Sequence, residues 1–271
     1  MTRDDLIAAF AAHAEADPRV LALLLGGSLG AGGGDAYSDA DLIVVLAPEH
    51  HGAFVEQVRA WAGEIAAPVL WRQVYPGLPL FHAITPGWIR FDITVTVPGR
   101  VTGARAGLKP LFDRAGVWDA LPERMEPRSI DPAKLEAMIV EFLRVMGLLV
   151  VGMGRREYVL GITGVGLLRG LLIELMIAET RPPLPPGALH LADILPPADI
   201  DTLAGLPHAA ADRASVIVAN LVLAELFLPR ARALARQVGA VWPDAFEAAT
   251  RAHLRRDLGL ELPEALLADS N

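Results

Sequence analysis

Two aspartates that are separated by one residue constrain this chain more than any other feature of its sequence. Asp39 and Asp41 stand at the start of an apolar run over residues 42–46, and a glycine-rich turn over 26–34 precedes them. Alternate side chains of a β-strand point the same way, so both carboxylates are expected on one face, about 7 Å apart along the backbone. Carboxylates this close repel one another unless a cation lies between them. The pattern therefore predicts a site for a divalent metal.

A third acid lies on a later segment in which polar and apolar residues alternate. Residues 90–97 read Arg-Phe-Asp-Ile-Thr-Val-Thr-Val, which places Arg90 and Asp92 on the polar face of an expected strand. If that strand lies beside the one that contains Asp41, three carboxylates converge, and such a cluster can hold one or two Mg²⁺ ions against nucleotide phosphates. Arg90 is expected either to contact a phosphate or to pair with Asp92 and keep it ionised.

Composition and charge limit the size of the core, the ligands and the cysteine chemistry that this chain can have. The chain has 271 residues, of which 53% are hydrophobic and 21% charged, so it can bury the core of one large domain or of two ordinary ones. Its formal net charge of -8 argues against nucleic acid as the main partner, because a phosphate backbone needs a positive surface. Cysteine is absent, which excludes disulfides and thiolate sites and suits a reducing cytoplasm.

The expected elements change character along the chain. A capping box at Thr2 begins an N-terminal helix, a second helix is expected over 51–65, and strands are expected over 20–25, 42–46, 69–75, 80–85, 88–97 and 109–113. From residue 133 onward only helices are expected, over 133–153, 155–180, 209–237 and 243–258. The third of these should kink or break at Pro229, and a proline-rich ordered loop is expected over 181–197.

The predicted fold class is therefore α+β. An N-terminal mixed-sheet domain is expected over 1–122 and an all-α helical bundle over 131–271, joined by a proline-rich, charged connection.

Two of the expected helices are apolar enough to raise the question of a membrane. They include residues 137–153 and 159–178, and each carries two charges near its middle. The charges are Glu141, Arg144, Arg169 and Glu174. A charge at mid-span costs about 2.5–3.5 kcal/mol on insertion scales. Both segments are therefore interpreted as buried helices of a soluble bundle that hold internal ion pairs, and no membrane partner is expected.

Two other interpretations of the glycine turn explain fewer of the residues. The aspartates can cap a turn that enters a strand, but this leaves Asp92 and the Gly27-Ser28 pair without a role. A dinucleotide-binding Gly-x-Gly-x-x-Gly fingerprint that began at Gly30 would need glycine at position 35, where aspartate stands. The seven histidines show no ligand spacing and are interpreted as surface or structural residues.

Taken together, these motifs resemble those of the DNA polymerase β-like nucleotidyltransferase superfamily. The family pattern is Gly-Gly or Gly-Ser after an apolar residue, then Asp-apolar-Asp-apolar, and later a lone acid on a strand. The chain supplies these as Gly26-Gly27-Ser28, Asp39-Ala40-Asp41-Leu42 and Asp92, with Ser38 as the usual neighbour of the first aspartate. The likeness is greatest to a small bacterial branch that includes aminoglycoside and lincosamide adenylyltransferases, which also append a helical domain.

The resemblance implies an activity and a role for each residue. It implies that Gly27 and Ser28 hold nucleotide phosphates, with Ser38 and Arg90 in the same nucleotide site. It implies that Asp39 and Asp41 ligate Mg²⁺, and that Asp92 ligates a second ion or acts as general base on the acceptor hydroxyl. The three aspartates are thus the expected catalytic and metal-binding residues, and ATP or another NTP is the expected co-substrate.

The expected reaction transfers a nucleoside monophosphate, AMP from ATP in the first instance, to a hydroxyl of a small molecule. An aminoglycoside-type antibiotic is one candidate acceptor, which would make the protein a resistance enzyme. The alternatives are an AMPylating enzyme of toxin–antitoxin type that modifies a protein hydroxyl, and a catalytically silent module that binds nucleotide. A cytoplasmic monomer or homodimer is expected, while the acceptor and the nucleobase stay open.

Overall fold

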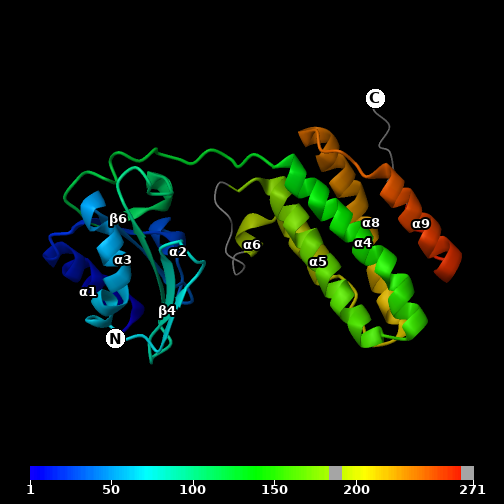
Figure 1. The fold of residues 1–271 in the computed structure, drawn as a ribbon, viewed down its shortest axis with the longest axis horizontal. Helices are drawn as coiled ribbons and strands as arrows, with labels where there is room; N and C mark the ends of the chain where they lie inside the picture. The colour runs from blue at the N-terminus through cyan, green and yellow to red at the C-terminus, as the bar shows by residue number, and fades with distance from the viewer. Residues whose placement is uncertain (183–190, 264–271) are drawn as a thin grey trace. The chain divides into compact units, whose positions relative to one another are not determined.

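A computed structural model describes residues 1–182 and 191–263 of the chain. It divides into two compact units, Met1–Glu126 and Pro127–Asn271 (Figure 1). The first unit contains a mixed six-stranded sheet with helices, and the described part of the second contains helices without strands. The predicted α+β fold class is therefore confirmed.

The sheet of the first unit has the strand order β3-β4-β5-β2-β1-β6. Its strands are β1 (Val20–Leu25), β2 (Ala40–Leu46), β3 (Leu70–Gln73), β4 (Leu80–Ile84), β5 (Arg90–Thr96) and β6 (Lys109–Asp113). Only the central pair, β2 and β5, is parallel among these strands, and the other neighbours are antiparallel. Each expected strand is present, with ends that shift by at most two residues.

Two helices cover one face of this sheet. Helix α1 (Arg3–Ala16) begins at the predicted capping box, because the Thr2 and Asp5 side chains each accept from the other's backbone amide. Helix α3 (Pro48–Gly63) begins three residues earlier than expected, since a proline is well tolerated in the first helical turn. Their buried residues join Phe91 and the other apolar side chains of β5 in one core.

The opposite face of the sheet is only partly covered. A small cluster over β1 and the edge of β2 includes Ala22, Leu24 and Val45, and packs against Leu108 and Val117. Along β2, β5 and β4 the residues of this face alternate with the buried ones, as the burial patterns of the three strands show. This open face carries the polar residues singled out in the sequence.

The described helices of the second unit lie side by side in a bundle (Figure 1). They pack around an apolar core of their own. These helices are α4 (Pro132–Arg155), α5 (Tyr158–Thr180), α6 (Leu191–Ile194), α7 (Pro197–Ala204), α8 (Arg213–Val238) and α9 (Asp244–Leu258). Phe142 of α4 and Phe227 of α8 stack with their ring centroids 3.9 Å apart at the centre of this core. Helix α4 also packs against α5 and α9.

Three expectations for this unit were wrong. Helix α8 does not break at Pro229, because Phe227, Leu228 and Ala231 are fully buried on both sides of it and this packing outweighs the lost backbone hydrogen bond. Helices α6 and α7 occupy part of the segment expected to be a loop or left unassigned. Residues 183–190 of the predicted 181–197 loop lie outside the described residues.

The third concerns the charges on the apolar helices. Glu141 and Arg144 do pair at 2.7 Å, but both side chains are more than 40% exposed. Arg169 donates to the carbonyl of Leu203 instead of pairing with Glu174, which is exposed. The charges therefore lie at the rim of the bundle, where water solvates them. By length and composition alone, α4, α5 and α8 are each apolar enough to cross a membrane.

Candidate functional site

The parallel pairing of β2 with β5 brings two of the predicted acids together. In this register Asp41 lies directly beside Asp92, and both point to the open face of the sheet. Burial, reinforced by the negative charges of Asp39 and Asp92, raises the pKa of Asp41 to about 6. Burial also raises the pKa of Asp92, against a hydrogen bond from His82 that lowers it. The acids thus form one electrostatically coupled group.

The glycine turn lies against the carboxylate of Asp41. The amide of Gly26 donates to the Asp41 carbonyl at 2.8 Å, which fixes the turn at the end of β1. Gly27, at the start of the short helix α2 (Gly27–Gly30), has a φ of +59°, and a Cβ built on it would lie 1.9 Å from Asp41 Oδ2. Glycine is required here twice over, by the backbone conformation and by the carboxylate.

A polar network holds the loop between the glycine turn and β2. The Ser28 hydroxyl lies 2.8 Å from the Ser38 hydroxyl, which lies 3.0 Å from the Asp35 carboxylate. The Arg3 guanidinium donates to the backbone carbonyls of Asp35 and Ser38, and so connects the loop to α1. The two serines assigned to nucleotide binding therefore lie in contact, although ten residues separate them in sequence.

Arg90 bridges the same loop and the acids. Its guanidinium donates to the Tyr37 carbonyl at 2.8 Å and lies 3.9 Å from the Asp39 carboxylate. Its charge also lowers the pKa of Asp41 and of Asp92. The ion pair expected between Arg90 and Asp92 is thus replaced by one with Asp39, since the loop carries Asp39 toward the guanidinium.

His82 is the residue of this site that the sequence interpretation missed. It lies on β4 opposite Asp92, and its Nδ1 is 2.6 Å from Asp92 Oδ2. The available signal was the hairpin: a turn at Pro86-Gly87 that pairs two alternating strands places His82 across from Asp92. The search for metal-ligand spacing among histidines alone could not find it, because its partner is a carboxylate on the next strand.

The predicted site residues therefore gather at one end of the open sheet face. Each of them touches another or lies directly beside another, and they are Gly27, Ser28, Ser38, Asp39, Asp41, Arg90 and Asp92. His82 joins them through Asp92.

The carboxylates have the right chemistry for a hard divalent cation, which takes oxygen ligands. Within residues 1–182 and 191–263, however, no group of three or more His, Asp or Glu side chains is drawn together as a metal-binding cluster. Cationic or polar neighbours hold two of the acids instead, His82 on Asp92 and Arg90 on Asp39. The donor set fits Mg²⁺, and an ion would take over contacts that these two side chains make.

Comparisons with known proteins add little to this geometry. No family model matches the chain, and no curated protein matches it. Among solved structures, it is similar to an aminoglycoside 6-adenyltransferase from Bacillus subtilis, with 12% identity and a TM-score of 0.42 over 93% of this chain and 95% of that one. The function proposed below rests on the residues of this chain.

Proposed function

We propose that this chain is a Mg²⁺-dependent nucleotidyltransferase that transfers a nucleoside monophosphate, AMP from ATP in the first instance, to a hydroxyl group of a small molecule. The observation that carries the proposal is the pairing of Asp41 with Asp92 on adjacent parallel strands, with Gly27 packed against the Asp41 carboxylate. Crowding desolvated acids is costly without a cation, and the raised pKa of Asp41, about 6, reflects that cost.

In this proposal each residue has a task that its position supports. Asp39 and Asp41 hold Mg²⁺, which when bound supplies the positive charge that phosphate oxygens need during transfer. Gly27 and Ser28 hold the phosphates from the turn, where the missing Cβ leaves room for a close approach. Arg90 orients the nucleotide-binding loop through the Tyr37 carbonyl.

Asp92 acts as the general base. It takes the proton from the acceptor hydroxyl, whose oxygen forms a bond to the α-phosphorus while pyrophosphate leaves. Its raised pKa suits this task, because a base titrating nearer neutrality accepts a proton more effectively than an ordinary carboxylate. His82 Nδ1 holds Asp92 Oδ2 and so aims the other carboxylate oxygen.

The setting of the reaction belongs to the same proposal. A cytoplasmic protein without a nucleic-acid partner is supported by the absence of cysteine and by the net charge of -8. An aminoglycoside is a candidate acceptor because it is a polycation with many hydroxyls, and acidic groups attract it.

The test measures pyrophosphate release with Mg²⁺ and each of ATP, GTP, CTP and UTP, across a panel of aminoglycosides and lincosamides. We expect acceptor-dependent release that Asp41→Asn or Asp39→Asn lowers by roughly a thousandfold or more. Asp119→Asn is the matched control, since Asp119 is an exposed acid of the same unit and should retain full activity.

Two outcomes would replace the proposal. If α-labelled ATP and a cell lysate yield a labelled protein band and no labelled small molecule, the chain modifies proteins. If ATP binds saturably by calorimetry while no acceptor yields pyrophosphate, it is a nucleotide-binding module without transferase activity. Full pyrophosphate release by Asp41→Asn would refute the assignment of the metal site itself.

A further inference from the structure

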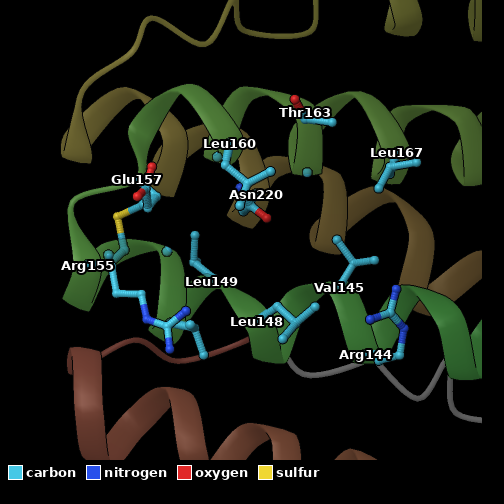
Figure 2. Close-up of a pocket in the computed structure, with 15 residues that line it drawn as sticks. Arg144, Val145, Leu148, Leu149, Arg155, Glu157, Leu160, Thr163, Leu167 and Asn220 are labelled. Carbon is cyan, nitrogen blue, oxygen red and sulfur yellow. The ribbon is translucent and has the colours of Figure 1, made fainter.

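A groove runs between α4 and α5 in the helical unit (Figure 2). It shares no lining residue with the acids of the sheet. It encloses about 230 Å³ and is walled mainly by apolar side chains. Leu148, Leu149 and Val145 come from α4, and Leu160 and Leu167 come from α5. Leu148, Leu160 and Leu167 are between 49% and 63% exposed, far more than core leucines.

Glycines give this groove its room. Gly152 of α4 and Gly161 and Gly164 of α5 all line it. A Cβ on Gly152 would meet nothing within 4 Å, and one on Gly164 would meet only Val145, at 3.9 Å. The space beside these two glycines is therefore open, and larger residues would fill it.

One polar side chain lies at the floor of the groove. Asn220 of α8 is 2% exposed, and Figure 2 shows its amide between α4 and α5. Its Nδ2 donates to the Val216 carbonyl at 2.8 Å, which fixes the amide orientation because a carbonyl can only accept. Among the described residues no donor bonds its Oδ1. The side chain is almost fully buried, yet it lines the groove, so this oxygen faces the groove with its acceptor capacity unused by the protein. A ligand in the groove that carries a donor can bond it.

Charges stand only at the two ends of the groove. Arg155 and Glu157 lie at one end and Arg144 at the other (Figure 2). The interior offers no ionised group among its described lining residues, so an ionic head could be accommodated only at an end. The interior suits an uncharged apolar body.

We propose that the α4–α5 groove binds a small, mostly apolar molecule that carries one hydroxyl or N–H donor, and that this donor bonds Asn220 Oδ1. The site is independent of the proposed transferase activity. A lipid surface fits the observations less well, although both helices are apolar enough to meet one. A bilayer contacts side chains that project from a helix, whereas Asn220 lies at the floor of a concave groove.

The test uses two probes of similar shape, para-butylphenol and para-butylanisole, which differ in that the methyl ether lacks the donor. Binding of each to the full chain is measured by calorimetry or by ligand-observed NMR. We expect saturable binding of both, with the phenol about tenfold tighter, as one net hydrogen bond supplies. This comparison needs no variant, so it holds even where a substitution impairs folding.

Variants then locate the donor's partner. Asn220→Leu, similar in size, should abolish the preference for the phenol and keep binding of the ether. Thr163→Val is the matched control, because it removes a different polar group, the Thr163 hydroxyl, from the lining. It should leave the tenfold preference for the phenol unchanged. Gly164→Leu, which fills the groove, should weaken both probes at least tenfold. Circular dichroism checks that each variant keeps its helices.

Equal binding of the two probes by the wild-type chain, or no saturable binding of either, overturns the proposal. So does a phenol preference that survives Asn220→Leu. Co-sedimentation of the chain with vesicles of phosphatidylcholine and phosphatidylglycerol, without saturable binding of either probe, also overturns the proposal and indicates a lipid contact instead.

Discussion

The open face of the sheet and the α4–α5 groove both place polar groups in partly buried surroundings, but in opposite ways. On the sheet, acids are crowded together, and the Arg90 guanidinium and the His82 imidazole hold two of them in place. In the groove, a single neutral amide stands alone among apolar side chains. The first arrangement suits chemistry on charged phosphates, because its groups respond to charge. The second suits recognition, because one unmatched acceptor selects a donor.

Glycine serves both regions, again differently. Gly27 has a left-handed backbone and leaves space for a carboxylate of its own unit. Gly161 and Gly164 have ordinary helical backbones: Gly161 lets Val216 of α8 pack closely, and Gly164 leaves open space beside α5. A methyl group added at each position therefore tests a different property, and the predictions below use this contrast.

The largest expected effect is that of Asp41 ionisation on the free energy of unfolding of the metal-free chain. At a pH well below its ordinary pKa of 3.8, the Asp41 carboxyl is protonated in both the folded and the unfolded chain. Its burial therefore does not lower the free energy of unfolding at that pH. As the pH rises toward 6, the unfolded chain loses this proton while the folded chain, with a pKa of about 6, retains it. The free energy of unfolding should therefore fall by roughly 2–2.5 kcal/mol between pH 4 and pH 7.

Urea unfolding in EDTA, followed by circular dichroism, measures this fall as the difference between wild type and Asp41→Asn, in which the titrations of groups far from Asp41 cancel. Asparagine cannot ionise, so the variant should be the more stable protein at pH 7. Excess Mg²⁺ should return stability to the wild type alone. A wild-type chain that tracks Asp41→Asn across the whole pH range would show that the acids are not crowded.

The second-largest effect is expected on the transfer rate when the turn glycine, Gly27, is replaced. Gly27→Ala places a methyl group where Asp41 Oδ2 lies, so the carboxylate must move. A displacement of about 1 Å at a reacting group costs roughly a hundredfold in rate, and we expect that loss in pyrophosphate release. Gly32→Ala is the matched control: its φ is +78°, so it carries similar backbone strain, but nothing lies within 4 Å of its added Cβ. Equal activities for the two variants would refute a role for the Gly27–Asp41 contact.

The sequence alone predicts much of the site on the open sheet face and little of the α4–α5 groove. Acids at the start of apolar strands differ from the residues around them, so Asp39, Asp41 and Asp92 are recognisable in the sequence. Strand alternation places Asp41 and Asp92 on one face. Asn220 lies inside an apolar helix, and its groove is lined by the same residue types that form the core. Hydrophobic periodicity identifies such a helix but cannot say which apolar face stays uncovered.

His82 belongs to the sheet site, but its role, like that of Asn220, is not recognisable from the local sequence. Its importance depends on strand register, which puts it opposite Asp92, and register follows from a turn whose geometry the sequence only suggests. Pro229 is similar in kind, since local rules predict a break that burial on both sides of it overrides. In both cases the missing information was tertiary.

A smaller effect is expected at His82 itself. Removing the imidazole in His82→Ala takes away the hydrogen bond that lowers the pKa of Asp92, so that pKa should rise further. More of the base is then protonated at low pH, so the loss of transfer should be greater at pH 6 than at pH 8. His50→Ala, at an exposed histidine of α3, is the control and should follow the wild-type profile. A loss of the same size at every pH would assign His82 a purely structural role.

The smallest effect separates the two groove glycines. Gly164→Ala adds a methyl group at ordinary contact distance, and alanine favours a helix interior over glycine by about 0.5–1 kcal/mol, so the free energy of unfolding should rise by up to that amount. Gly161→Ala gains the same propensity, but its Cβ would lie 3.0 Å from Val216, a fully buried and rotationally restricted side chain. Overpacking there should cost about 1–2 kcal/mol and reverse the sign. Paired urea titrations measure both changes, and a stabilised Gly161→Ala would mean that α5 moves freely against α8.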